Sequence, residues 1–185
     1  MPEQWTVRDI SRAMLPLLLA LSTVEIASGL VLGSIEDTLL AKPSLLVLVP
    51  VTIGTAGNLG SILAARLSTA VHLGTVEFDP TDDTLAGNAI ATVALALSVF
   101  PGVGLGAWVL TELTVGAVLG PLDVVFVAFS SGAVLAVLAI VVTLTATYAA
   151  YRLGLDPDDV VIPVVTNTCD VLGVLVLFAV VSLLL

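Results

Sequence analysis

Five long apolar stretches, separated by short polar segments, follow one another along the chain. Each has roughly 20 or more residues with few charges, which is enough for a helix to cross the ~30 Å hydrocarbon core of a bilayer. The dyad alternation of a membrane β-barrel is absent. The pattern therefore predicts an all-α integral membrane protein with five transmembrane helices. The spans are expected at about residues 14–33, 44–68, 84–110, 122–152 and 160–185.

The first apolar stretch is interpreted as a retained span rather than a cleaved signal peptide. It is long, contains Glu25, and is not followed by the small-residue pattern of a cleavage site. We expect a single membrane domain over residues 1–185, with no soluble regulatory domain before or after it. With 58% hydrophobic residues, 11% charged residues and a mean hydropathy of +1.19, the composition agrees with a membrane class rather than a soluble one.

The few basic residues predict the orientation. Arg8 and Arg12 precede the first span, Arg66 ends the second and Arg152 ends the fourth. With five spans and a cytoplasmic N-terminus, these four lie in the cytoplasm and only Lys42 lies outside, as the positive-inside bias requires. We therefore expect a multi-pass protein of the plasma membrane, with its C-terminus outside.

The segment Phe100–Gly106 allows an alternative count of six spans. Its proline and three glycines could end one helix and start another. Six spans would place Arg152 outside, against the charge bias, so five are preferred. We expect a break or flexible bend in this segment. No strand–turn–helix unit surrounds these glycines, so they are no dinucleotide fingerprint.

The acidic residues gather in two loops, at 69–83 and 153–159, and the net charge is −10 with a single lysine. Such a chain repels nucleic-acid phosphates and offers no polybasic patch for anionic lipid. Two compatible interpretations are open: a surface adapted to high salt, and a mouth that concentrates cations. We expect the two loops to be a place, apart from the membrane spans, where divalent cations bind.

Cysteine and histidine occur once each, at Cys169 and His72. Neither an internal disulfide nor a Cys/His metal site within one chain is therefore expected. We expect Cys169 to be a small packing residue and His72 to lie in a loop.

Three carboxylates, Glu25, Glu112 and Asp170, fall in or near the apolar spans, where a charge is costly and marks a functional hypothesis. Glu112 lies close enough to a span end to reach water. Glu25 precedes Gly29 and Gly33, whose small-xxx-small spacing predicts close helix packing. Glu25 is therefore interpreted as a neutral packing residue, with a role in a pore as the alternative.

Asp170 belongs to a polar stripe on the last span. Pro163, Thr166, Asp170 and Gly173 share one helix face by their three- and four-residue spacing. An interhelical hydrogen bond would be the purely structural explanation of the carboxylate. We prefer a pore-lining role, because a bare carboxylate is an expensive way to make one such bond.

The second span carries the matching polar segment. Gly54 and Gly57, three residues apart, can expose carbonyls on one side, and Asn58 adds an amide oxygen. At ~1.5 Å per residue, Asn58 lies about 21 Å from one membrane surface and Asp170 about 14 Å from the other. Their sum roughly matches one membrane thickness, so both are expected at similar depth. Tight packing of small residues is a compatible second role.

A site of carboxylate, amide and carbonyl oxygens suits a hard cation. Mg²⁺ keeps several waters and takes one or two carboxylates. One aspartate per chain balances little of a divalent charge. We therefore expect a homodimer, which would supply two aspartates, because twofold dimers are the commonest oligomers.

Three stretches in order resemble the membrane domain of the MgtE-type magnesium channel and transporter family, including its animal two-domain carriers. They are Pro50–Gly60, Ala65–Ala70, and the segment from Arg152 to Gly173. The resemblance covers essentially the whole chain. It implies a homodimer with a cation pore between protomers, lined by the second and fifth spans.

The resemblance also implies site residues. Asp170 would coordinate hydrated magnesium, and Asn58 and the backbone near Gly54 would line the pore. Ile62 and Asp159 depart from bacterial members, which often have glutamine and asparagine there. The cytoplasmic regulatory domains that gate those members have no counterpart in this sequence, which puts their gating mechanism in doubt.

The leading hypothesis is a channel or transporter for a divalent cation, Mg²⁺ above all, with Asp170, Asn58, Gly54, Gly57 and Thr166 at its site and Glu25, Asp159 and Gly173 as secondary candidates. Two alternatives are a proton- or sodium-coupled exporter, with Asp170 or Glu25 titrating, and a non-transporting membrane assembly subunit. An enzyme is not expected, because no nucleophile–base pair or phosphate loop is present.

Overall fold

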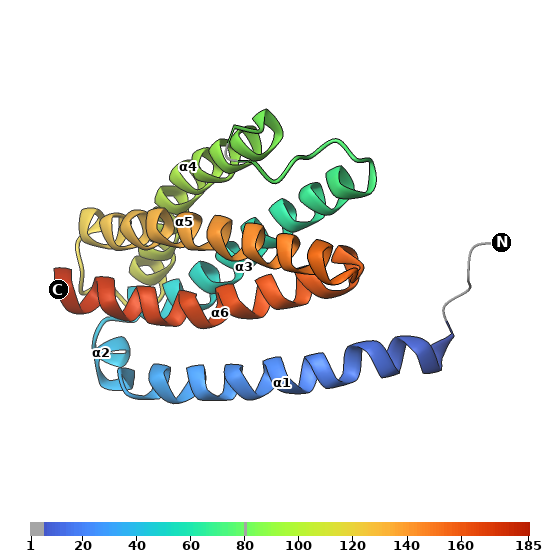
Figure 1. Cartoon of the computed structure of the whole chain (residues 1–185). Coiled ribbons are helices and arrows are strands. Elements are labelled where there is room, and N and C mark those ends of the chain that lie inside the picture. Colours follow the sequence, from blue (N-terminus) through green and yellow to red (C-terminus); the bar gives the residue numbers. More distant parts are fainter. Residues whose placement is uncertain (1–5, 80) are drawn as a thin grey trace.

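A computed structural model describes residues 6–79 and 81–185 and is built from helices only over these residues (Figure 1). Five of the helices are long and apolar enough to cross a membrane, which confirms the predicted number of spans. The helices are α1 (Val7–Gly33), α2 (Glu36–Ala41), α3 (Pro43–His72), α4 (Asp83–Thr114), α5 (Pro121–Leu153) and α6 (Pro157–Leu184).

The helix ends differ from the expected spans mainly by extension into the polar segments. α1 begins at Val7, α3 continues to His72, and α4 continues to Thr114. The predicted spans followed hydropathy, whereas a helix continues beyond the apolar region as long as its end is capped. The short α2, which no apolar stretch predicted, connects α1 to α3.

The helix starts follow local sequence rules. Proline occupies the first turn of α3, α5 and α6, where its missing N–H is not needed. Asp82 caps α4 by accepting a hydrogen bond from the Leu85 N–H, and its other carboxylate oxygen accepts one from the Glu77 N–H. These backbone donors, that of Glu77 first, hold the pKa of Asp82 below its ordinary value.

Helices α3, α4, α5 and α6 form one packed bundle, and α1 lies outside it (Figure 1). α3 contacts each of α4, α5 and α6, whereas α1 packs along α6. Only 6% of the apolar window of α1 is buried inside the chain, against 44% for α3 and α5. Most of the α1 surface is therefore left for lipid or for another protein chain.

Small residues set the distance between α4 and α5. The Phe100 ring of α4 is fully buried against Gly132 of α5, where a Cβ would lie 2.2 Å from the ring. About one turn further along α4, a Cβ on Gly104 would lie 2.8 Å from the Val125 Cα of α5. The two helices therefore approach each other through one glycine from each side.

The expected break at Phe100–Gly106 is wrong. α4 runs through Pro101 and the three glycines as a single helix. The proline removes one backbone donor and the glycines have low helix propensity, but packing against α5 outweighs both, because Phe100 and Gly104 are tightly enclosed there.

We predict that Gly104→Ala destabilises the protein, because the added methyl would meet the α5 backbone rather than a movable side chain. Overpacking of this kind costs about 1–3 kcal/mol. Gly102→Ala is the matched control, since its Cβ would meet nothing within 4 Å in the same helix. Thermal unfolding of the purified variants in detergent measures the difference. Equal stability of the two variants would contradict the packing described.

Candidate functional site

The polar stripe of α6 lies directly against the glycine-rich segment of α3. A Cβ on Gly173 would lie 3.2 Å from the Ile53 Cα, and one on Gly57 would lie 3.1 Å from an Asp170 carboxylate oxygen. One turn further along α3, a Cβ on Gly60 would lie 2.5 Å from Val165. The helices are antiparallel and in contact over three turns, with a glycine at each point of closest approach.

The Asp170 carboxylate lies at the centre of this contact and is half-buried. Among the described residues it has no hydrogen-bond or ion-pair partner, so the structure does not support the explanation that it serves an interhelical hydrogen bond. Its charge interacts with that of Glu25 on α1. The chain thus brings together two of the three carboxylates that the sequence places within apolar segments.

Glu25 lies on the one face of α1 that contacts the bundle. Ser28 and Leu32, three and seven residues further, are buried or packed against the core, and Glu25 itself is half-buried. The expected close packing at Gly29 and Gly33 is not present within the chain, because a Cβ at either glycine would meet nothing within 4 Å. Both glycines are exposed on α1.

Thr166 contacts α3 through a pair of hydroxyl groups. Its Oγ1 lies 2.8 Å from Ser61 Oγ and 2.9 Å from the Ile162 carbonyl, while Ser61 Oγ lies 2.8 Å from the Gly57 carbonyl. Each hydroxyl has one proton to donate. When one hydroxyl donates across to the other helix, only one of the two carbonyls can receive a hydrogen bond. Ser61, which the sequence analysis did not select, is therefore part of this contact.

Asn58 and Gly54 lie on the open side of α3. Both are exposed, and a Cβ on Gly54 would meet nothing within 4 Å. The Asn58 amide has no hydrogen-bond partner among the described residues. Asn58 directly follows Gly57, the residue that touches Asp170. The amide and the carboxylate therefore lie at neighbouring levels of the two helices.

The remaining predicted residues have different surroundings. Gly173 is buried against α3 and acts as a contact point. Asp159 is half-buried in the first turn of α6. Glu112 is in the last turn of α4, where its carboxylate accepts a hydrogen bond from the Ala117 N–H, as expected of a residue near a span end. Cys169 is buried beside Gly60 as a small packing residue.

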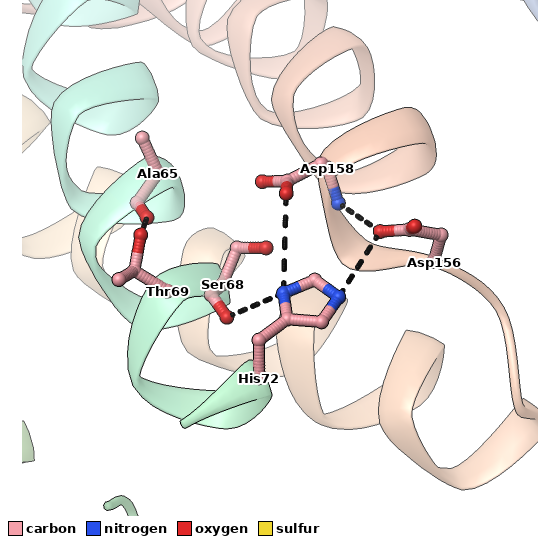
Figure 2. A network of polar contacts seen from close by, with 6 residues as sticks. All are labelled: Ala65, Ser68, Thr69, His72, Asp156 and Asp158. Carbon is pink, nitrogen blue, oxygen red and sulfur yellow. Dashed lines mark hydrogen bonds and ion pairs between the residues drawn. The ribbon is translucent and has the colours of Figure 1, made fainter. Parts of the chain in front are cut away.

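A second polar cluster lies at the end of the bundle where α3 stops and α6 begins (Figure 2). The His72 imidazole is placed between two carboxylates, with Nε2 3.6 Å from Asp156 Oδ1 and Nδ1 3.9 Å from Asp158 Oδ2. The expectation that His72 lies in a loop is wrong, because it is the last residue of α3. The extra helical turns beyond the apolar stretch carry it to the start of α6.

Residues 49–180 match the MgtE family, described as divalent cation transporters. The matched segment starts just before Pro50 and ends near the close of α6, so it includes the whole contact between the glycine segment and the polar stripe. The chain belongs to the MgtE family. No curated protein matches it at the level of individual sequences.

Membership of the MgtE family explains the class of chemistry to expect. The family consists of divalent cation transporters and is not an enzyme family, in agreement with the interpretation of the sequence. Together with five helices able to cross a membrane, it makes this chain a multi-pass membrane protein. Among the described residues of this MgtE-family chain, the carboxylates of Glu25 and Asp170 influence each other electrostatically, and the Asn58 amide has no hydrogen-bond partner.

We predict a measurable coupling between Ser61 and Thr166, because their hydroxyls are the direct polar link between α3 and α6. In a double-mutant cycle of Ser61→Ala and Thr166→Val, the coupling energy should be about 0.5–1.5 kcal/mol, the range of hydrogen bonds between membrane helices. Reversible unfolding in mild detergent gives the four stabilities.

The control cycle pairs Thr166→Val with Ser98→Ala. Ser98 is exposed on α4 and bonds only to the Leu95 carbonyl of its own helix. This second cycle should give no coupling. A coupling of the same size in both cycles, or none in either, would contradict the direct hydroxyl contact.

Proposed function

We propose that this MgtE-family protein moves hydrated Mg²⁺ across the plasma membrane, through a pore lined by α3 and α6 of two copies of the chain. The observation that carries the proposal is the set of three unpartnered polar groups, Glu25, Asn58 and Asp170, in helices that span the membrane. Each group loses its water on entering hydrocarbon and gains no protein partner in return, an expensive arrangement unless water or an ion is present.

The charge around these groups favours a cation. No lysine, arginine or histidine pairs with Glu25 or Asp170 among the described residues. Two carboxylates that interact with each other raise the energy of the ionised state. A divalent cation beside them relieves this repulsion, and its waters can bridge to the Asn58 amide.

The ligand chemistry fits Mg²⁺ better than a softer metal. The polar groups without a partner are carboxylates and an amide, beside the exposed Gly54, and the buried thiol of Cys169 is packed against Gly60. Hard oxygen ligands suit Mg²⁺, which keeps much of its hydration shell. Asp170 would hold the ion through its water, with Asn58 and the exposed backbone at Gly54 on the opposite wall.

Other predicted residues support this wall rather than touch the ion. Gly57 and Gly173 allow α3 to approach the Asp170 level of α6, and the Gly57 carbonyl accepts from Ser61. Thr166 uses its hydroxyl in the contact between the two helices. Asp159, in the first turn of α6, would lie at the mouth of the pore.

A homodimer is proposed because, within one chain, the face of α3 that would line the pore is exposed. Gly54 and Asn58 lie on an exposed face of α3, which also carries Val51 and Ile62, 41% and 53% exposed. A second copy related by a twofold axis would close this face and add a second Asp170.

The proposed orientation places the N-terminus and the ends of α3 and α5 in the cytoplasm, by the positions of Arg66 and Arg152. The C-terminus then lies outside. The acidic residues near the cytoplasmic ends would draw divalent cations to the mouth and form a second place for Mg²⁺.

Removal of the Asp170 charge tests the transport function. Asp170→Asn should lower Mg²⁺ flux into liposomes by at least about tenfold, since a loss of 1.4 kcal/mol of ion stabilisation already has that effect. Glu112→Gln is the matched control, because it removes a carboxylate near the far end of α4 that bonds only to the Ala117 N–H. The control should keep its flux.

The same liposomes distinguish the alternatives. Full Mg²⁺ flux in Asp170→Asn, with the fold intact by gel filtration, would refute a transport role for this carboxylate. Flux that runs only with a proton or sodium gradient would identify a coupled exporter, the alternative that the Glu25–Asp170 interaction favours. Absence of flux in the unmodified chain would leave an assembly subunit.

Cross-linking tests the dimer. In a Cys169→Ala background, Asn58→Cys should be joined between two copies by a short bifunctional thiol reagent, because both cysteines would face one pore. Leu95→Cys, 45% exposed on α4, is the control and should stay monomeric on a denaturing gel. Equal cross-linking at both positions, or none at residue 58, would contradict a pore between the α3 faces.

A further inference from the structure

We infer that His72, Asp156 and Asp158 form a binding site for a late first-row divalent metal such as Zn²⁺, Ni²⁺ or Co²⁺, which ties the end of α3 to the start of α6. The three side chains can each direct one ligand atom to within 4.8 Å of the other two. Figure 2 shows the imidazole reaching from the last turn of α3 to the two carboxylates. This site is separate from the membrane site at Asp170 and does not depend on the proposed transport function.

The imidazole is oriented as in a metal site. Its Nδ1 lies 3.0 Å from the Ser68 carbonyl of the preceding helical turn. A carbonyl can only accept, so this bond makes Nδ1 a protonated nitrogen, and in the neutral imidazole it leaves the Nε2 lone pair free. Histidines that bind metals usually donate their other N–H to such a carbonyl or a carboxylate. The free Nε2 is the nitrogen that faces Asp156.

The distances leave room for an ion. Two ligand atoms that are each about 2.1 Å from a tetrahedral metal lie about 3.4 Å apart. His72 Nε2 and Asp156 Oδ1 are 3.6 Å apart, so a metal fits between them without movement of the backbone. Asp158 Oδ2 lies 3.9 Å from the other ring nitrogen, Nδ1, so its exposed side chain would have to rotate to add an oxygen beside Nε2. Water would complete the coordination.

The local charge favours a cation over a simple ion pair. Asp156 and Asp158 have no lysine or arginine partner among the described residues. Besides the imidazole, Asp156 Oδ1 contacts the Asp158 N–H, from which it accepts a hydrogen bond of 3.0 Å at the start of α6. All three side chains are roughly half exposed, and ion pairs at such positions contribute little to stability. A metal would neutralise both carboxylates at once and use the free nitrogen.

The ligand set determines the class of metal. One imidazole and two carboxylates suit late first-row divalent ions, whereas Mg²⁺ takes oxygen ligands and binds imidazole poorly. The cluster therefore differs in selectivity from the oxygen groups at Asp170. Metal binding would hold the end of α3 against the start of α6, and should raise the unfolding temperature of the protein.

Metal titration of the full chain tests the site. The protein must carry no polyhistidine tag, since His72 is its only histidine. Calorimetric titration with Zn²⁺ and with Ni²⁺ should show one site per chain with higher affinity than Mg²⁺. The unfolding temperature should rise by several degrees at about 100 times the dissociation constant. His72→Gln should weaken binding by at least about tenfold, as loss of a ligand is expected to do.

Two variants separate this site from the rest of the molecule. Asp83→Asn removes an exposed carboxylate at the start of α4 and should leave Zn²⁺ binding unchanged. Asp170→Asn should also leave it unchanged, while His72→Gln keeps Mg²⁺ flux. The inference is overturned if Zn²⁺ binds no more tightly than Mg²⁺, if His72→Gln binds Zn²⁺ like the unmodified protein, or if Asp170→Asn removes the binding. If Asp170→Asn loses Mg²⁺ flux but still binds Zn²⁺, the result supports the proposed pore and leaves the inference about the His72 site standing.

Discussion

The closeness of α3 and α6 is the constraint on which the polar centre of the molecule depends. Membrane helices gain little from the hydrophobic effect when they pack together, so contact relies on shape and short polar links. Here a Cβ at any of the glycines 57, 60 and 173 would lie within 3.1 Å of an atom of the facing helix. The same contact brings the Ser61 and Thr166 hydroxyls within bonding distance.

This packing has a consequence for the Asp170 carboxylate. A side chain larger than glycine at position 57 would take the space beside the carboxylate. With glycine there, one side of Asp170 rests against backbone and the other remains accessible. The close contact therefore orients the carboxylate without giving it a hydrogen bond, and a group held in this way keeps its capacity to attract an ion.

The sequence predicts the spans well because hydropathy alone decides which helices can enter a bilayer. It also selects Asp170, Gly57 and Thr166, which the fold does bring together, because helix periodicity and antiparallel order are local properties. Whether these residues bind an ion stays a prediction. The expected break near Pro101 failed because the packing of Phe100 against Gly132 is a tertiary effect that no local rule contains.

Two other features depend on contacts between distant segments and were missed for that reason. His72 meets Asp156 only because α3 continues beyond its apolar part and α5 returns the chain to the same end. Glu25 comes within electrostatic range of Asp170 only because α1 packs along α6. For the contact between His72 and Asp156, the sequence held one signal. His72 follows the end of the second apolar stretch, and Asp156 stands in a later loop just before a helix, where aspartate is a common cap.

The pairing of α1 with α6 gives the chain a fixed order of maturation. α1 leaves the ribosome before α6, so α1 must wait in the bilayer until α6 has been synthesised. During that time the apolar surface of α1 is matched by lipid, but Glu25 has no protein neighbour with which to share its environment. The arrival of α6 thus completes the bundle and, in the same step, creates the pair of carboxylates. A truncated chain that lacks its last helix could still insert, yet it would lack the acidic centre.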